Sequence, residues 1–149
     1  MKKLNFKKVI LTIISLFVIW NIIWFSATTI RYHKFVKVIP QDENGLHGMV
    51  GDDGYTYYVK KPDYLHFTGN LAISNSDKGQ DLIIWPHIIG GYEYGFRLRK
   101  NEDVYEIYVD KNLEPVNKDH PVDVQLVKEF NKDLQELYEK ADNMWGLSK

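Results

Sequence analysis

The chain contains no cysteine, and this absence removes several kinds of site at once. Disulfides, zinc sites with thiolate ligands and thiol nucleophiles all need that residue, as does lipoprotein processing. Net positive charge is also lacking beyond the N-terminus. From Arg31 onwards the chain has 15 basic and 20 acidic residues, which gives a net charge of −5. A nucleic-acid-binding domain needs a basic surface, so this composition argues against a nucleic-acid partner. It argues equally against a domain that lies flat on an anionic membrane.

The chain also contains a long segment without charged residues, the 22 residues from Val9 to Ile30. As a helix this run spans roughly 30 Å, the thickness of the hydrocarbon core of a bilayer. Basic residues stand just before it: Lys2, Lys3, Lys7 and Lys8. A buried core helix is disfavoured because the run has no polar face. The pattern predicts a membrane-spanning segment at 9–30 that contacts the lipid bilayer.

Alanine is scarce near the end of this run, and a secretory cleavage site prefers small residues. A cut after Ala27 leaves the bulky Phe25 at the third position back, which makes a poor site. The run is also longer than the apolar region of most signal peptides. We therefore expect an uncleaved signal anchor rather than a cleaved signal. Trp20 and Trp24 suit the outer membrane interface, although they serve equally well as apolar filler.

The basic tail at 1–8 predicts a cytoplasmic N-terminus, with the domain at 31–149 outside the cell membrane. Arg31, Lys34 and Lys37 follow the span, so the number of basic residues on its two sides is nearly balanced. The short tail has no fold of its own to hold it in either compartment. Lysine outnumbers arginine by 16 to 3, which is typical of AT-rich bacterial genomes and most simply of a Gram-positive bacterium.

The remaining 119 residues suffice for one α+β domain with about six to seven antiparallel strands. Asp53-Gly54 between extended segments predicts a hairpin. Leu65–Ser74 alternates apolar and polar residues, as a half-buried strand does. Arg31–Ile39 also alternates enough at its end to form a first strand. Leu82–Ile89 is apolar on both faces, and its Pro86 predicts a bulge or an edge because proline donates no ladder hydrogen bond.

The C-terminal segment changes from strand to helical periodicity. Apolar residues recur at intervals of three and four along Val122–Trp145, which predicts one amphipathic helix over a face of the sheet. Pro121 suits its first turn and Gly146 its end. The side chains expected to pack on the sheet include Phe130, Leu134 and Leu137.

The candidate ligand-binding residues lie in the most apolar part of the strand region. Trp85 and His87 share one face of the expected strand, where Pro86 interrupts the ladder and opens a possible pocket floor. Tyr92 and Tyr94 belong to a tyrosine-rich stripe, and exposed aromatic stripes bind sugars, peptides or proteins. The ordinary explanations stay open, because a half-buried histidine and wet tyrosine hydroxyls are common in strands.

No metal, cofactor or catalytic site is predicted. The five histidines show no ligand spacing such as HxH or HExxH, and Asp52 with Asp53 suits a tight turn better than a carboxylate pair. The serines lack the context of a nucleophile elbow. A phosphate-binding glycine loop and a dinucleotide-binding motif are both missing.

These observations favour a membrane-anchored extracytoplasmic binding module of the cell envelope. Its partner would be an envelope protein, a peptide or a glycan. A small hydrolase that uses His87 with a carboxylate brought near by folding is the alternative, as is an immunity or inhibitor protein. A third possibility assigns the function to the span itself, since Asn21 is able to hydrogen-bond to another membrane helix.

Overall fold

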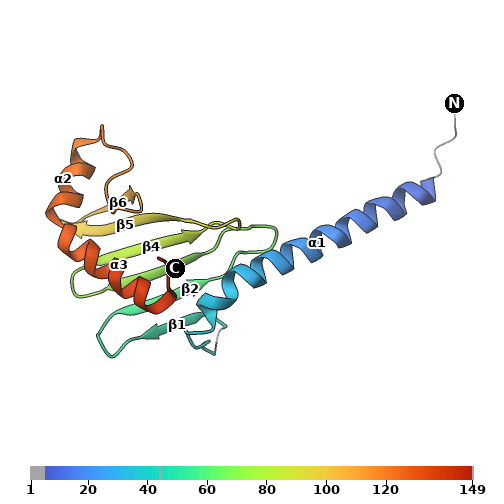
Figure 1. Ribbon diagram of the computed structural model, residues 1–149, viewed down its shortest axis with the longest axis horizontal. Coiled ribbons are helices and arrows are strands. Elements are labelled where there is room, and N and C mark those ends of the chain that lie inside the picture. Colours follow the sequence, from blue (N-terminus) through green and yellow to red (C-terminus); the bar gives the residue numbers. More distant parts are fainter. Residues whose placement is uncertain (1–5, 44, 149) are drawn as a thin grey trace.

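The computed structural model describes residues 6–43 and 45–148, and it consists of one long helix followed by an α+β domain (Figure 1). The long helix is α1 (Phe6–Val36). The elements that follow are β1 (His47–Val50), β2 (Thr56–Lys60), β3 (Asn70–Asn75), β4 (Gln80–Pro86), β5 (Tyr92–Lys100), β6 (Asp103–Val109), α2 (Pro121–Glu129) and α3 (Asn131–Trp145). Lys2 and Lys3 of the expected basic tail lie outside the described residues.

Helix α1 is long and apolar enough to cross a membrane, and it contains an 18-residue window of mean hydropathy 2.3 with no buried residue. It is therefore compatible with a membrane anchor, although a signal sequence shares these properties. The first strand expected at Arg31–Ile39 is wrong, because α1 continues to Val36. Tyr32 and Phe35 lie three residues apart on one side of the helix, and both are buried in the core of the domain.

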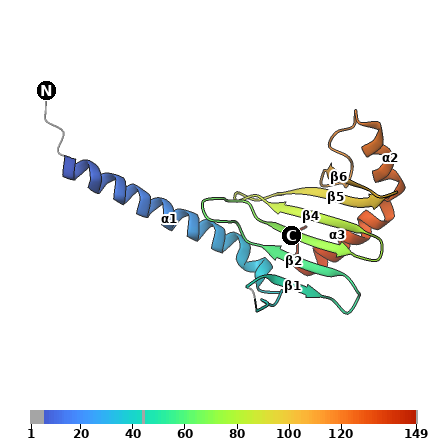
Figure 2. The ribbon, with the colours of Figure 1, turned by 180° about the vertical axis from the view of Figure 1, so that it is seen from behind.

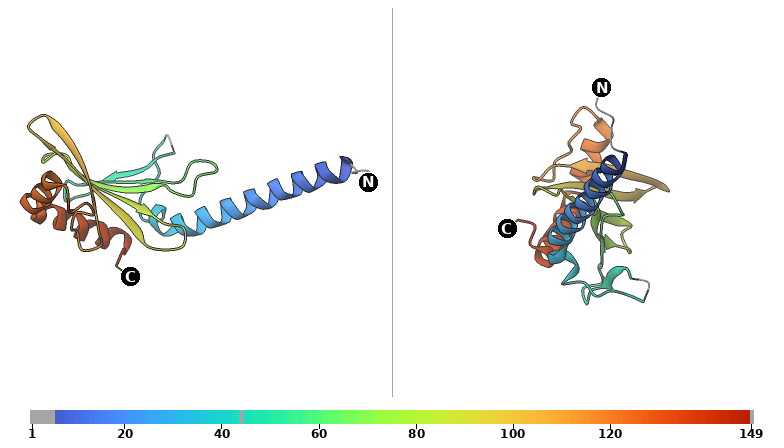
Figure 3. Two further views of the ribbon diagram at one scale, coloured as in Figure 1. Left: turned by 90° about the horizontal axis from the view of Figure 1, so that it is seen from above. Right: turned by 90° about the vertical axis from the view of Figure 1, so that its right-hand side faces the viewer.

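The six strands form one antiparallel sheet in the order β1-β2-β3-β4-β5-β6, which confirms the expected meander. Successive side chains alternate between two faces. Both C-terminal helices cover one face, as Figure 3 shows from above, and no helix among the described residues lies on the opposite face. We call these the covered face and the open face. The covered face supplies most of the core: Tyr55, Tyr57, Val59, Leu71, Ile73, Leu82, Ile84, Tyr94, Phe96, Leu98, Ile107 and Val109.

Two details of the expected strands are wrong. The strand predicted at Leu65–Ser74 begins only at Asn70, because the preceding residues leave the sheet and pack on α1. Gly69 marks the change, since a Cβ there would lie 2.1 Å from the carbonyl oxygen of Lys60. Pro86 causes no bulge, because it pairs with Tyr92 as the last residue of β4, where the ladder ends anyway.

The single C-terminal helix expected at Val122–Trp145 is two helices, α2 and α3, which change direction at Phe130 (Figure 1). Phe130 has φ −102° and ψ 17°, outside the helical range. The expected packing of Leu134 and Leu137 onto the sheet is confirmed, since both are buried in the core, while Phe130 is only partly buried. Gly146 ends α3 in the left-handed conformation, as its sequence position predicts.

Candidate ligand-binding cleft beside the anchor helix

The four predicted ligand-binding residues are divided between the two faces of the sheet. Trp85 lies on the open face and stacks on Tyr108, with 5.7 Å between ring centroids and 27° between ring planes. Gly95 makes room for this ring, because a Cβ there would come within 2.8 Å of it. Tyr92 and Tyr94 lie on the covered face, so the four do not form one site.

His87 lies just beyond the end of β4 and is exposed. Its backbone N–H donates to the carbonyl oxygen of Gly91 at 3.1 Å, which closes the β4–β5 turn. Its Nε2 lies 3.5 Å from a carboxylate oxygen of Glu93. Folding therefore brings a carboxylate to His87, but the pair stands on the surface, where water screens it.

A cleft of about 600 Å³ opens on the covered face where α1 enters the domain. We call it the anchor cleft. Helix α1 contributes one side, the β4–β5 turn and the start of β5 another, and the end of α3 a third. The residues that line it are Arg31, Lys34, Gly90, Gly91, Tyr92, Tyr94, Lys111, Tyr138, Leu147 and Ser148. Two of the four predicted residues thus belong to it.

Two cations reach the anchor cleft from the last turns of α1. The Arg31 guanidinium donates from Nη2 to the carbonyl oxygen of Gly91 at 2.9 Å and lies 5.1 Å from the ring centroid of Tyr92. Its Nε is buried and has no hydrogen-bond partner among the described residues. The Lys34 ammonium donates to the hydroxyl oxygen of Tyr92 at 3.0 Å. Aromatic rings hold both cations without neutralising them.

The charge of the anchor cleft is mainly positive. Lys111 is a third cation, and none of the ion pairs between described residues includes it, Arg31 or Lys34. One carboxylate lies at the rim: Asp142 accepts hydrogen bonds from the backbone N–H and the hydroxyl of Ser148, at 2.8 and 2.7 Å. Among the described residues, three cations and one such carboxylate leave the site with a net positive charge, which suits an anionic group.

Three tyrosines form the floor of the anchor cleft. The Tyr94 ring lies 5.7 Å from that of Tyr138 and 6.2 Å from that of Tyr92. Burial raises the pKa of Tyr94 above its usual value, and the neighbouring tyrosines and Asp142 raise it further. Its hydroxyl therefore stays protonated near neutral pH and is a neutral donor. The site offers charge and hydrogen bonds for binding.

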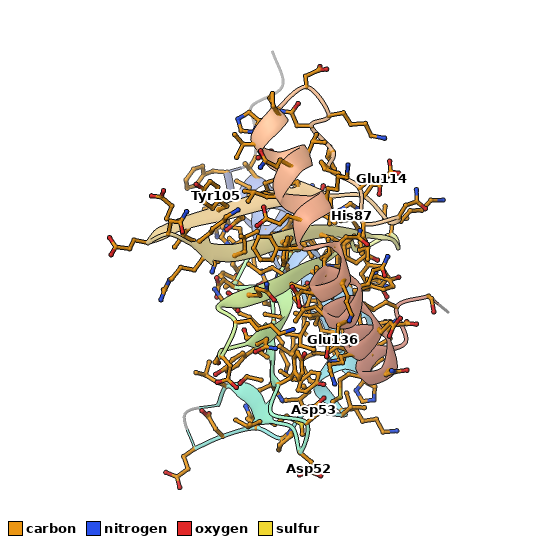
Figure 4. All side chains as sticks on the ribbon, turned by 90° about the vertical axis from the view of Figure 1, so that its left-hand side faces the viewer. Asp52, Asp53, His87, Tyr105, Glu114 and Glu136 are labelled. Atoms are coloured by element: carbon orange, nitrogen blue, oxygen red, sulfur yellow. The ribbon has the colours of Figure 1, made fainter. Side chains whose placement is uncertain are left out.

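Of the two aspartates considered from the sequence, Asp53 holds a turn in place. Asp53 accepts hydrogen bonds from the backbone N–H of Tyr55, the hydroxyl of Tyr57 and the ammonium of Lys140, and so ties the β1–β2 turn to α3. Asp52 stands beside it at the edge of the domain (Figure 4). No group of three or more possible metal ligands occurs among the described residues.

Comparisons with protein-family models, with curated proteins and with solved structures found no match to this chain. The assignment of the anchor cleft as a candidate site therefore depends on its geometry alone. Sequence reasoning missed Arg31, Lys34, Lys111 and Tyr138, because they come from segments far apart in the chain. Only the basic residues that follow the apolar run gave a signal, and that signal indicates membrane topology as readily as a binding site.

Proposed function

We propose that the protein is a membrane-anchored extracytoplasmic binding module that takes an anionic group in the anchor cleft. Helix α1 is the anchor, the basic tail lies in the cytoplasm and the domain lies outside. The observation that carries the proposal is the cluster of three cations around a tyrosine-lined cleft, none of which forms an ion pair with another described residue. A negatively charged portion of an envelope protein, peptide or glycan is the class of ligand that it fits.

Contacts of α1 with the domain support an uncleaved anchor. The Trp24 indole donates a hydrogen bond to the carbonyl oxygen of His66, and Asn21 accepts one from the hydroxyl of Tyr64 at 2.6 Å. Both helix residues precede Ala27, so cleavage there would remove partners that the domain uses. Asn21 is thus paired within this chain, which weakens the case for a second membrane helix as its partner.

Topology is tested with protease added to intact, wall-stripped cells. We expect the domain to be digested from outside, and the protein to stay in the membrane fraction after an alkaline wash. Digestion only after lysis would reverse the orientation, and mature protein beginning near Thr28 in the medium would contradict the anchor.

Ligand binding is tested on the full chain in nanodiscs of zwitterionic lipid, titrated with inorganic phosphate and with citrate at constant ionic strength. We expect a saturable rise of the melting temperature, because a ligand that binds only the folded state stabilises it. In the Lys34→Gln/Lys111→Gln variant the apparent Kd should rise at least tenfold, the effect of losing about 1.4 kcal/mol of binding free energy.

The matched control is Lys118→Gln/Lys132→Gln, which removes the same charge from residues that do not line the anchor cleft. It should bind as the unchanged protein does. Binding that falls equally in both double variants would mean a general charge effect. Without any saturable shift in the unchanged protein, the anchor cleft would lose its proposed role.

A small hydrolase is the second candidate, and the observation that favours it is the approach of Glu93 to His87 at 3.5 Å. A carboxylate beside an imidazole is the arrangement of a general base and the group that orients it. The His87→Gln variant separates the two functions when stability and cellular function are measured independently. Lost function at unchanged stability would favour the enzyme, whereas a fully functional variant would remove His87 from consideration.

A further inference from the structure

Two loops at one end of the sheet expose apolar side chains next to α1. The β2–β3 loop (residues 61–69) and the β4–β5 turn (residues 87–91) lie at this end, which we call the proximal end, because alternate connections of a meander share an end. Figure 2 shows both on the side from which α1 leaves the domain. Tyr64 and Leu65 are 54% and 47% exposed, and Ile89 is 99% exposed.

The β2–β3 loop lies against the apolar part of α1. Phe67 packs edge-on against Trp20, with ring centroids 5.7 Å apart, and Tyr64 packs in the same way on Trp24 at 5.2 Å. Tyr64 also donates its hydroxyl hydrogen to Asn21. Every one of these helix residues falls within the uncharged run, so the loop extends alongside the segment expected in the membrane.

Helix length determines how deep these contacts lie. With Lys8 at the inner boundary, a 30 Å hydrocarbon core takes about 20 residues of α1 at about 1.5 Å each and ends near Thr28. Trp24 then lies about 6 Å inside the outer boundary. A tilted helix places still more residues in the core, so tilt does not lift the loop out of the bilayer.

The backbone of the loop suits a site with little water. The N–H of His66 donates to the carbonyl oxygen of Asp63 at 2.9 Å, and the carbonyl of His66 accepts from Trp24. The N–H of Gly69 donates to the Tyr32 hydroxyl at 2.7 Å. Polar backbone groups at membrane depth need such internal partners. Leu65 adopts a φ of +66°, a conformation that costs a non-glycine residue free energy and often marks functional segments.

We propose that the proximal end of the domain is embedded in the outer interfacial region of the bilayer that α1 crosses, with Tyr64, Leu65 and Ile89 in contact with lipid. This inference rests on α1 being an uncleaved anchor. Aromatic residues favour the interface, and Trp24 and Tyr64 lie nearest to it, whereas Trp20 lies deeper in the hydrocarbon core. The domain would then stand upright on the membrane in one fixed orientation.

The net charge of −5 does not oppose this arrangement, because the two proximal loops, residues 61–69 and 87–91, carry only one lysine and one aspartate between them. The turns at the opposite end, the distal end, carry Asp52, Asp53, Asp77 and Glu102. The proximal loop has the cations Lys60 and Lys61 at its start, and its one acidic residue, Asp63, is paired with Lys60 at 2.9 Å. Only the proximal end needs to meet the lipid head groups.

The experiment uses the full chain, whose lack of cysteine allows single labels. An environment-sensitive fluorophore is attached to Leu65→Cys, Ile89→Cys and the distal control Val104→Cys, in phosphatidylcholine nanodiscs. Lipids with a nitroxide at a shallow acyl position should quench the first two labels at least threefold more than the control. Aqueous iodide should show the reverse order. Equal quenching at positions 65, 89 and 104 would overturn the proposal.

A label at Phe17→Cys, which lies near the bilayer centre and is read with lipids that carry the nitroxide near the end of the acyl chain, separates the two ways of failing. If this label is quenched while those at positions 65 and 89 are not, the anchor stands and the embedded end does not. If none of the labels is quenched, the anchor fails, and the inference with it. A second measurement leaves the protein unmodified: lipids with a photoreactive acyl chain should crosslink to residues 63–67 and 88–90, and crosslinks only to α1 would contradict the proposal.

Discussion

The proximal and distal ends of the sheet are built in different ways. The distal turns are stabilised by residues within them. Gly54 and Gly79 adopt positive φ angles, and the Asp53 carboxylate accepts a hydrogen bond from the nearby Tyr55 N–H. The proximal loops depend on a helix that is distant in sequence, through contacts such as Tyr32 with Gly69 and Arg31 with Gly91. Both ends use local turn chemistry, and the proximal end adds long-range contacts with α1.

The largest expected effect tests whether α1 belongs to the core of the proximal end. Phe35 is 0% exposed, so Phe35→Ala should lower the free energy of unfolding by about 3–5 kcal/mol. Chemical denaturation of the full chain in detergent, followed by near-UV circular dichroism, measures it. Phe25→Ala on the exposed side of α1 is the control and should leave stability unchanged. Equal stabilities of the two variants would mean that α1 is attached to the domain without being part of it.

A smaller effect concerns the hydrogen bond that holds the β2–β3 loop on α1. Tyr32→Phe removes the acceptor of the Gly69 N–H and leaves this donor unpaired, which should cost about 1–3 kcal/mol. Hydrogen exchange at Gly69 should speed up together with the loss of stability. Tyr58→Phe changes an exposed hydroxyl on the open face and serves as the control. Unchanged exchange at Gly69 in the Tyr32 variant would show that the loop does not depend on α1.

The smallest effect belongs to the distal end. The hydrogen bond from Lys140 lowers the pKa of Asp53. This carboxylate therefore stabilises the fold above its unfolded-state pKa of about 3.9, and the stabilisation disappears as the pH falls through the lower folded-state value. Because the pair is partly exposed, Asp53→Asn should cost only about 1 kcal/mol at pH 7.

The pH dependence checks this assignment. The difference in melting temperature between the unchanged protein and Asp53→Asn should be largest near pH 7 and should shrink as the pH falls from about 5 towards 3. A difference that stays constant over this range would assign the loss to packing instead of charge. The Lys140→Gln variant should reproduce the effect of Asp53→Asn, since both remove the same pair.

The same contrast explains what the sequence predicted. The meander, the Asp53-Gly54 turn and the packing of Leu134 and Leu137 follow from residues close together in the chain, and the structure confirms them. The strand expected at Arg31–Ile39 is wrong because α1 continues to Val36, and the strand expected at Leu65–Ser74 is correct only from Asn70, because the residues before it pack on α1. Alternation of apolar residues does not distinguish a strand from a loop that packs on a helix.

The candidate site was predicted only in part, for the same reason. Tyr92 and Tyr94 belonged to a visible aromatic stripe, whereas the cations beside them come from α1 and from the chain after β6. Trp85 was predicted because it stands next to Pro86 and His87 in the sequence. It lies on the open face of the sheet, whereas the cleft is on the covered face. A site assembled from four segments that are far apart in the chain leaves no spacing pattern for sequence reasoning to detect.

The central claim is that α1 and the domain form one rigid body, and the distance between two spin labels tests it most directly. Leu11→Cys on α1 and Val104→Cys at the distal end are labelled in the full chain in nanodiscs, and the distribution of distances is measured by pulsed electron paramagnetic resonance. The account predicts a single narrow distribution, because the contacts of Trp24, Tyr32 and Arg31 fix the helix on the domain. A broad distribution, as a flexible joint between the helix and the domain would give, would contradict it.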